Sequence, residues 1–223
     1  MKLSYATHQE VDVKVGKISV IATDNPVVYR DMVFGFRGKN DLLRVYDDQF
    51  EEQKIESTID WLGDVADAEF DVKKYVTEIS KTTMAGLTEN NRNKTIEAIQ
   101  NLYNVIQSDL FMVDLPLQVA VDLDLKRALT FCKVHFDEGV MNNPYGIIES
   151  VIKVHEECSI GNCVALTNVA HYLDAEQFKD LCALIKDSGL SMIIIEFTEL
   201  EFQEFYKECD FTFIDQDFVD WHG

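Results

Sequence analysis

The chain has 223 residues with 40 acidic and 20 basic side chains, a net charge of −20 at pH 7. Apolar residues make up 47% of the sequence, which excludes an intrinsically disordered chain and suffices for a buried core. The charge balance argues against electrostatic capture of nucleic acid, or of an anionic membrane, by the surface as a whole. The five cysteines are irregularly spaced, which disfavours a disulfide framework and indicates a cytoplasmic protein. No apolar run approaches the roughly 20 residues of a membrane helix.

The first 64 residues have the pattern of an α/β domain. Residues 11–15 alternate between valine and charged residues, which predicts a half-buried strand. Residues 18–22 are nearly all apolar, which predicts a central strand covered on both faces. Asn25 and Pro26 then predict the start of a helix that ends near Gly38. Further strands are predicted at 42–46 and 57–62.

Residues 65–157 have helical spacing, and residues 158–223 return to α/β patterning. The chain therefore has an α/β fold class, with a head formed by residues 1–64 and 158–223 and an inserted α-helical region at 65–157. Within the insertion, helices are predicted over 72–83, 96–110, 117–132 and 147–155. The second part of the head is predicted to contain strands at 163–167, 190–197 and 211–214 and a helix at 174–188.

The sequence gives little support for nucleotide hydrolysis, zinc binding or a catalytic site. A phosphate-binding loop is absent, because Gly16-Lys17 precedes a strand and Gly38-Lys39 follows a helix. Cys158 and Cys163 lack the spacing of zinc ligands, and both are interpreted as buried thiols, as are Cys132 and Cys182. Asn168, His171 and Tyr172 follow a strand, where α/β active sites lie, but an ordinary βα turn is the preferred interpretation of these residues.

Four aspartates lie close together in the sequence where two middle helices are predicted to meet: Asp109, Asp114, Asp122 and Asp124. Crowded carboxylates repel one another, and a hard divalent cation such as calcium relieves that repulsion. A solvated acidic face is the alternative interpretation.

The scarce basic residues include four that are candidates for DNA binding: Lys126, Arg127, Lys133 and Lys153. Lys126 and Lys133 share one face of a predicted helix, and Arg127 lies about 100° away. The group forms either a locally positive strip or a set of surface salt bridges. The last 28 residues contrast with it, since they contain nine acidic residues and one lysine.

Several short blocks, in order along the chain, resemble the small accessory adaptation protein of type II-A CRISPR loci (the Csn-two family). One is RVYDDQ at 44–49, a strand leading into an aspartate turn, and another is IDWLGD at 59–64, before a long helix. The others are VDL at 113–115, AL at 128–129 with KV at 133–134, CVALTN at 163–168 and a strand ending in IIE at 194–196.

The resemblance implies a degenerate P-loop-like α/β head with an inserted helical leg. It also implies a non-catalytic homotetrameric ring that holds double-stranded DNA, preferably at ends, in a lysine-lined hole. Calcium ions would stiffen an acidic hinge, and the CRISPR integrase pair and type II effector nuclease would be partners in spacer acquisition. This chain has fewer acids in the hinge than the family pattern, so Asp109, Asp114, Asp122 and Asp124 would form a reduced calcium site.

Three functions remain open from the sequence. The first is the DNA-end-binding ring protein just described. The second is an acidic protein-interaction module that docks on a basic partner without touching DNA, as the acidic C-terminal stretch indicates. The third is a small enzyme with its site in the loop after Thr167.

Overall fold

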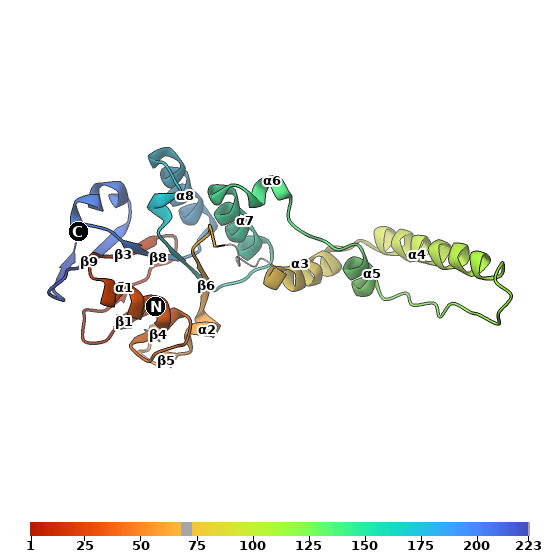
Figure 1. Ribbon diagram of the computed structural model, residues 1–223, viewed down its shortest axis with the longest axis horizontal. Coiled ribbons are helices and arrows are strands. Elements are labelled where there is room, and N and C mark those ends of the chain that lie inside the picture. Colours follow the sequence, from red (N-terminus) through yellow and green to blue (C-terminus); the bar gives the residue numbers. More distant parts are fainter. Residues whose placement is uncertain (68–72, 223) are drawn as a thin grey trace. The chain divides into compact units, whose positions relative to one another are not determined.

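The computed structural model describes residues 1–67 and 73–222, which divide into two compact units (Figure 1). Unit 1 comprises Met1–Asp71 and Asp137–Gly223, and unit 2 comprises Val72–Phe136. The strands are β1 (Lys2–Tyr5), β2 (Val11–Asp12), β3 (Ile18–Thr23), β4 (Leu43–Tyr46), β5 (Glu52–Gln53), β6 (Ile59–Gly63), β7 (Cys163–Thr167), β8 (Met192–Phe197), β9 (Asp210–Ile214) and β10 (Asp220–His222). The helices are α1 (Pro26–Phe36), α2 (Ile55–Thr58), α3 (Lys73–Gly86), α4 (Glu89–Leu110), α5 (Leu125–Phe131), α6 (Glu138–Met141), α7 (Pro144–Glu157) and α8 (Ala175–Ser188), with 3₁₀ turns η1 (Val169–His171) and η2 (Leu200–Tyr206).

A six-stranded sheet organises unit 1, in the order β10-β9-β3-β8-β7-β6. The five strands from β9 to β6 are parallel, and β10 adds an antiparallel edge. Every residue of β3 and β7 is buried, as the continuous apolar run at 18–22 predicted for a strand covered on both faces. The predicted α/β fold class is therefore confirmed.

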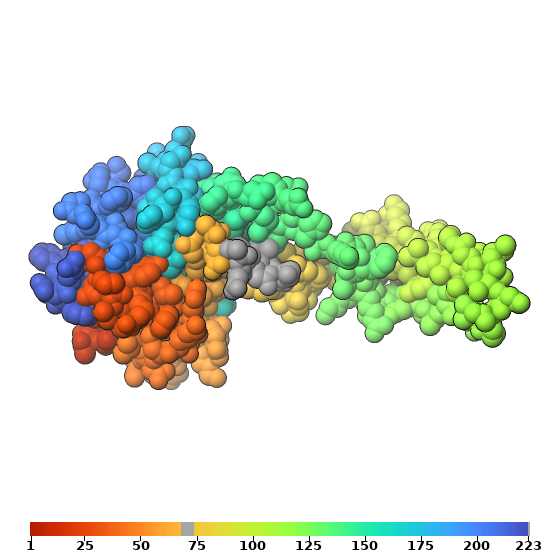
Figure 2. All heavy atoms as spheres, in the orientation of Figure 1, coloured from red at the N-terminus to blue at the C-terminus, as the bar shows by residue number. Residues whose placement is uncertain are grey.

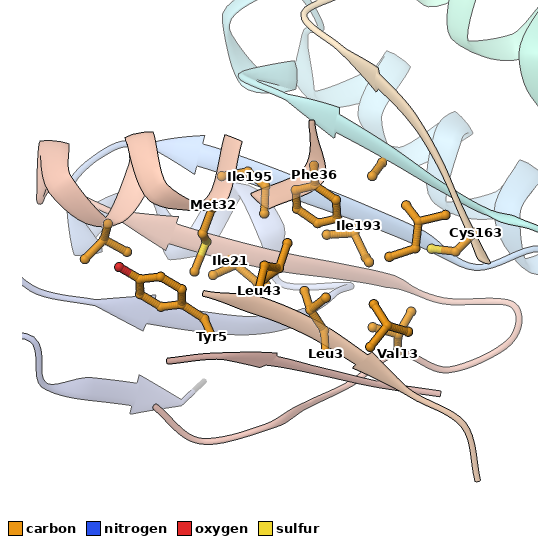
Figure 3. Close-up of a cluster of buried hydrophobic side chains, with 14 of the residues drawn as sticks. Leu3, Tyr5, Val13, Ile21, Met32, Phe36, Leu43, Cys163, Ile193 and Ile195 are labelled. Carbon is orange, nitrogen blue, oxygen red and sulfur yellow. The ribbon is translucent and has the colours of Figure 1, made fainter. Parts of the chain in front are cut away.

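One face of this sheet packs against α1 and a smaller antiparallel sheet of order β2-β1-β4-β5. Figure 3 shows the resulting core, in which Met32 and Phe36 of α1 meet Leu3 of β1, Leu43 of β4 and Ile193 of β8. Phe36 also stacks on Trp61, with ring centroids 4.7 Å apart and an interplanar angle of 6°. The short strands at 2–5 and 43–46 thus cover one side of the head.

The opposite side of the head contains α7 and α8 (Figure 1). Ile148, Val151 and Ile152 of α7 and Leu181 and Ile185 of α8 are fully buried. The predicted head–leg boundary at residue 157 is therefore too late, because α7 belongs to unit 1 and the division falls after Phe136. An amphipathic helix has the same sequence pattern whichever core its apolar face joins, so spacing alone could not assign α7 to a lobe.

The turn between β3 and α1 occupies the place where P-loop proteins bind phosphate. It consists of Asp24 and Asn25, and the side chain of Asn25 accepts a hydrogen bond from the amide of Val27 at 2.9 Å. This capping bond satisfies one of the amides that a helix N-terminus would otherwise offer to an anion. The head therefore has a P-loop-like strand–helix connection without a phosphate-binding loop.

Unit 2 contains α3, α4 and α5 and has little core of its own. Within its described side chains, only Tyr75 and Leu125 are buried. The helix predicted over 117–132 is shorter than expected, since α5 starts only at Leu125, where Asp124 caps it through the amide of Lys126 at 2.8 Å. Residues 114–124 contain no helix, and of the first predicted helical face, Val72 lies outside the described residues.

The acidic C-terminal segment is an integral part of unit 1. In Figure 2 the N-terminal (red) and C-terminal (blue) segments both lie on this unit. His8 Nδ1 lies 2.6 Å from Asp220 Oδ1, and the amide of Gln9 donates to Asp220 Oδ2 at 2.9 Å. Among the helices of the described residues, none is long and apolar enough to cross a membrane.

Candidate nucleic-acid interface

The net charge of the chain is unevenly divided between the two units. Unit 2 has eight lysines and arginines and seven acidic residues, a net charge of +1. Because the whole chain has 20 basic and 40 acidic residues, unit 1 holds the other 12 and 33, a net charge of −21. The acidic character that argued against nucleic-acid binding therefore belongs to unit 1 alone, and unit 2 is the part of the chain that a polyanion can approach.

A groove of about 620 Å³ in unit 2 brings together two of the predicted DNA-binding residues, Lys126 and Lys133. Both side chains are exposed, and no carboxylate of the described residues lies within 4.0 Å of either ammonium group. We call this the basic groove, and its full lining is Val76, Thr77, Ser80, Lys126, Thr130, Lys133, Val134, His135 and Phe136.

The two lysines reach the basic groove from different kinds of backbone. Lys126 lies in the first turn of α5, and Lys133 follows the end of that helix with a φ of +50°. The left-handed conformation is unfavourable for a residue with a Cβ. The shared-face prediction for residues 126 and 133 assumed a continuous helix, whereas the structure brings both side chains to one groove through a helix end.

The other two predicted DNA-binding residues are already engaged with carboxylates. Arg127 forms a hydrogen-bonded ion pair with Asp122, and its Nε lies 3.9 Å from Asp124 Oδ2. Lys153 lies in α7 of unit 1, with Nζ 2.7 Å from Glu149 Oε1. The sequence left two interpretations open, a positive strip and a salt-bridged surface. The first describes Lys126 and Lys133, and the second describes Arg127 and Lys153.

The predicted calcium ligands do not gather into a metal site. Asp122 accepts the amide of Asp124 at 2.9 Å and pairs with Arg127, while Asp124 caps α5. The hydrogen bond from the amide of Asp124 is the largest cause of a lowered pKa of Asp122, and the Arg127 guanidinium lowers this pKa further. Asp109 lies in the last turn of α4, and Asp114 lies in the following segment. Nowhere in residues 1–67 and 73–222 do three or more acidic, histidine or cysteine side chains form a metal-binding group, so the aspartates as arranged do not fit calcium.

Unit 2 exposes several large apolar side chains. Phe111, Met112 and Phe131 are 77%, 87% and 76% exposed, and α4 contributes further exposed residues at Leu102, Val105 and Ile106. Cys132, which was predicted to be buried, is exposed at the end of α5. Many exposed apolar side chains in one unit are typical of protein interfaces. Sequence reasoning missed them because the spacing in 96–110 indicated a buried helix face.

Comparison with known proteins identifies a shared fold. No family model and no curated protein matches the chain. The solved structure of Stu0660 of Streptococcus thermophilus aligns with a TM-score of 0.60 and 13% identity, over 100% of this chain and 76% of that one. Two ATP-binding proteins align at 10% identity: a putative ABC transporter protein from Pyrococcus furiosus, with a TM-score of 0.43 over 97% of this chain and 98% of its own, and a nucleotide-free ATP-binding cassette, with 0.45 over 100% and 90%.

Proposed function

We propose that this chain is a non-catalytic protein that binds double-stranded DNA through unit 2, assembles into a ring with other copies of itself, and acts in CRISPR spacer acquisition with the integrase pair and the effector nuclease. The observation that carries the DNA-binding part is the basic groove, in which two exposed lysines and the hydroxyl side chains of Thr77 and Ser80 line one concave surface. Ammonium and hydroxyl groups are the common partners of DNA phosphates.

The charge division supports this role. At physiological ionic strength the Debye length is about 8 Å, so a local positive surface acts independently of more distant acidic residues. Contacts that rest on phosphates carry no sequence information and weaken steeply with salt. The proposal therefore expects duplex binding that is independent of sequence.

The assignment to spacer acquisition rests on the ordered sequence blocks, and the fold shared with the Streptococcus thermophilus protein along the entire chain is consistent with it. The absence of catalysis is proposed because Asn25 caps α1 where a phosphate loop would lie. Self-assembly is supported by the exposed apolar residues of unit 2.

The test is a salt titration of duplex binding. We expect the double variant Lys126→Gln/Lys133→Gln to lose affinity for a fluorescent 30-base-pair linear duplex and to reduce the slope of log K against log salt by about two per chain. Lys81→Gln is the matched control, because Lys81 also lies in unit 2 but pairs with Glu78 at 2.6 Å. The single variants Arg127→Gln and Lys153→Gln should each reduce duplex affinity less than Lys126→Gln or Lys133→Gln alone. An unchanged slope in the double variant, or equal losses in all four variants, would contradict the proposal.

A further inference from the structure

A second pocket lies in unit 1 and is built differently from the basic groove. It is at the carboxyl ends of β7 and β8, beside the start of α1, and has a volume of about 350 Å³. We call it the edge pocket, and its lining is Pro26, Tyr29, Asn168, His171, Tyr172 and Phe197. It contains the three residues that the sequence singled out after Thr167, together with two aromatic residues that the sequence did not connect with them.

The rings of the edge pocket are held in place by hydrogen bonds. Asn168, in the left-handed conformation with φ +54°, donates from Nδ2 to the hydroxyl of Tyr29 at 2.7 Å and accepts the amide of Phe197 at 3.3 Å. Tyr29 and Phe197 meet edge to face, with centroids 5.5 Å apart. Tyr172 donates from its hydroxyl to Asp64 Oδ2 at 3.1 Å. Each tyrosine hydroxyl therefore has a partner within unit 1, and the pocket offers mainly aromatic surface to a ligand.

Two carboxylates set the electrostatic potential of the edge pocket. Asp64 contacts Tyr172 directly, and the fully buried Glu196 has Oε2 4.0 Å from His171 Nδ1. Burial is the largest cause of the raised pKa of Tyr29 and Tyr172, and the negative charges of Asp64 and Glu196 raise both further. Asp64, and Glu196 in its ionised form, therefore place negative charge next to the aromatic lining.

This combination favours a cation over an anion. Aromatic faces attract cations, and the planar guanidinium of arginine also stacks on them. A phosphate or carboxylate ligand would be repelled by Asp64 and Glu196, which lie behind the lining, and His171 is the one basic side chain in the lining itself. The net charge of −21 on unit 1 would attract a positively charged macromolecule to this surface.

We infer that the edge pocket receives an arginine side chain from a positively charged protein partner. Arginine is preferred to lysine because Tyr29, Tyr172 and Phe197 line the pocket, and a planar guanidinium stacks on aromatic rings where an ammonium group cannot. The site lies in unit 1 and uses none of the residues of the basic groove, so the chain would hold DNA and a basic protein on separate surfaces.

The test uses saturation-transfer NMR on the full chain without DNA, with the peptide acetyl-Gly-Ser-Arg-Gly-Ser-amide at 0.15 M salt. Matched peptides contain citrulline, a neutral analogue of similar shape, or lysine in place of arginine. We expect the citrulline peptide to bind at least fivefold more weakly than the arginine peptide, and the lysine peptide to be intermediate.

Protein variants locate the site. Phe197→Ala and Asp64→Asn should each weaken binding of the arginine peptide about fivefold or more, and asparagine can still accept the Tyr172 hydroxyl. Phe202→Ala and Glu201→Gln are the controls, because both residues are exposed in acidic η2 outside the pocket. Equal binding of the citrulline peptide, or equal losses in pocket and control variants, would overturn the inference and indicate non-specific capture by an acidic surface.

Discussion

Lys133 combines an unfavourable backbone conformation with a proposed phosphate contact, and the two can be separated. At φ +50°, glycine avoids the steric cost of a Cβ, which is about 1 kcal/mol. We expect Lys133→Gly to leave the melting temperature unchanged or slightly raised, while duplex affinity falls as far as in Lys133→Gln. Thermal unfolding and duplex titration of the two variants measure the two effects. A glycine variant that binds as tightly as the wild type would contradict the role of the Lys133 ammonium.

Glu196 gives unit 1 a pH-dependent stability. The side chain is buried, and that burial raises its pKa above the ordinary value of about 4.3. Above the unfolded-state pKa, the folded protein holds the proton more tightly than the unfolded chain, so stability falls as pH rises through the folded-state pKa. We therefore expect Glu196→Gln, which removes the charge but keeps an acceptor for the Ala170 amide, to gain stability relative to wild type between pH 5 and pH 8.

Urea unfolding of wild type and Glu196→Gln at both pH values measures this difference. Glu199→Gln is the control, since Glu199 is exposed. If the stability difference between wild type and Glu196→Gln is the same at pH 5 and pH 8, the carboxyl does not carry the burial cost assigned to it.

Helix α1 begins at a side-chain cap whose removal has a defined cost. Asn25 accepts the amide of Val27 and donates from Nδ2 to the carbonyl of Gln216 at 3.2 Å. We expect Asn25→Ala to lower the free energy of unfolding by about 1 kcal/mol or more, because it removes the cap and leaves buried polar groups unpaired. Asn25→Asp keeps the capping oxygen and should lose less. Urea titration of the three proteins ranks them, and an alanine variant as stable as the wild type would exclude a capping role.

The sequence predicted the elements of unit 1 well and those of unit 2 less well, for one physical reason. In unit 1 the apolar spacing of β3, α1 and α8 corresponds to burial against a sheet. In unit 2 the apolar residues at Leu117 and Val121 have helical spacing but no described layer to pack against, and both are exposed outside any helix. The spacing of apolar residues indicates which face a helix would bury. Tertiary contacts decide whether the helix forms.

The candidate site was predictable only in part. Lys126 and Lys133 could be nominated from charge and spacing. The sequence could not show that, among the described residues, Arg127 is ion-paired while they are not, because its pair with Asp122 depends on where α5 begins. The difference in net charge between the units could be calculated only once the boundary after Phe136 was known. The amphipathic pattern of α7 did not show to which unit this helix belongs. The edge pocket joins Tyr29 and Phe197 from distant positions, and no local pattern connects them.

At the scale of the whole molecule, the exposed apolar residues of unit 2 predict self-association. We expect Phe111→Ser/Met112→Ser to shift the protein toward the monomer, because this change replaces two of its most exposed apolar side chains with polar ones. Light scattering over a concentration series measures the shift. Phe50→Ser is the control, since Phe50 is 63% exposed on unit 1. A double variant with the mass of the wild type would place the association surface elsewhere.

The most direct test of the proposed ring is its solution mass by light scattering, alone and after addition of linear or closed circular duplex. The account predicts a mass four times the 25.6 kDa of the chain, which increases further with linear duplex and is unchanged by closed circular duplex. A 25.6 kDa monomer that takes up neither form of DNA would contradict the account.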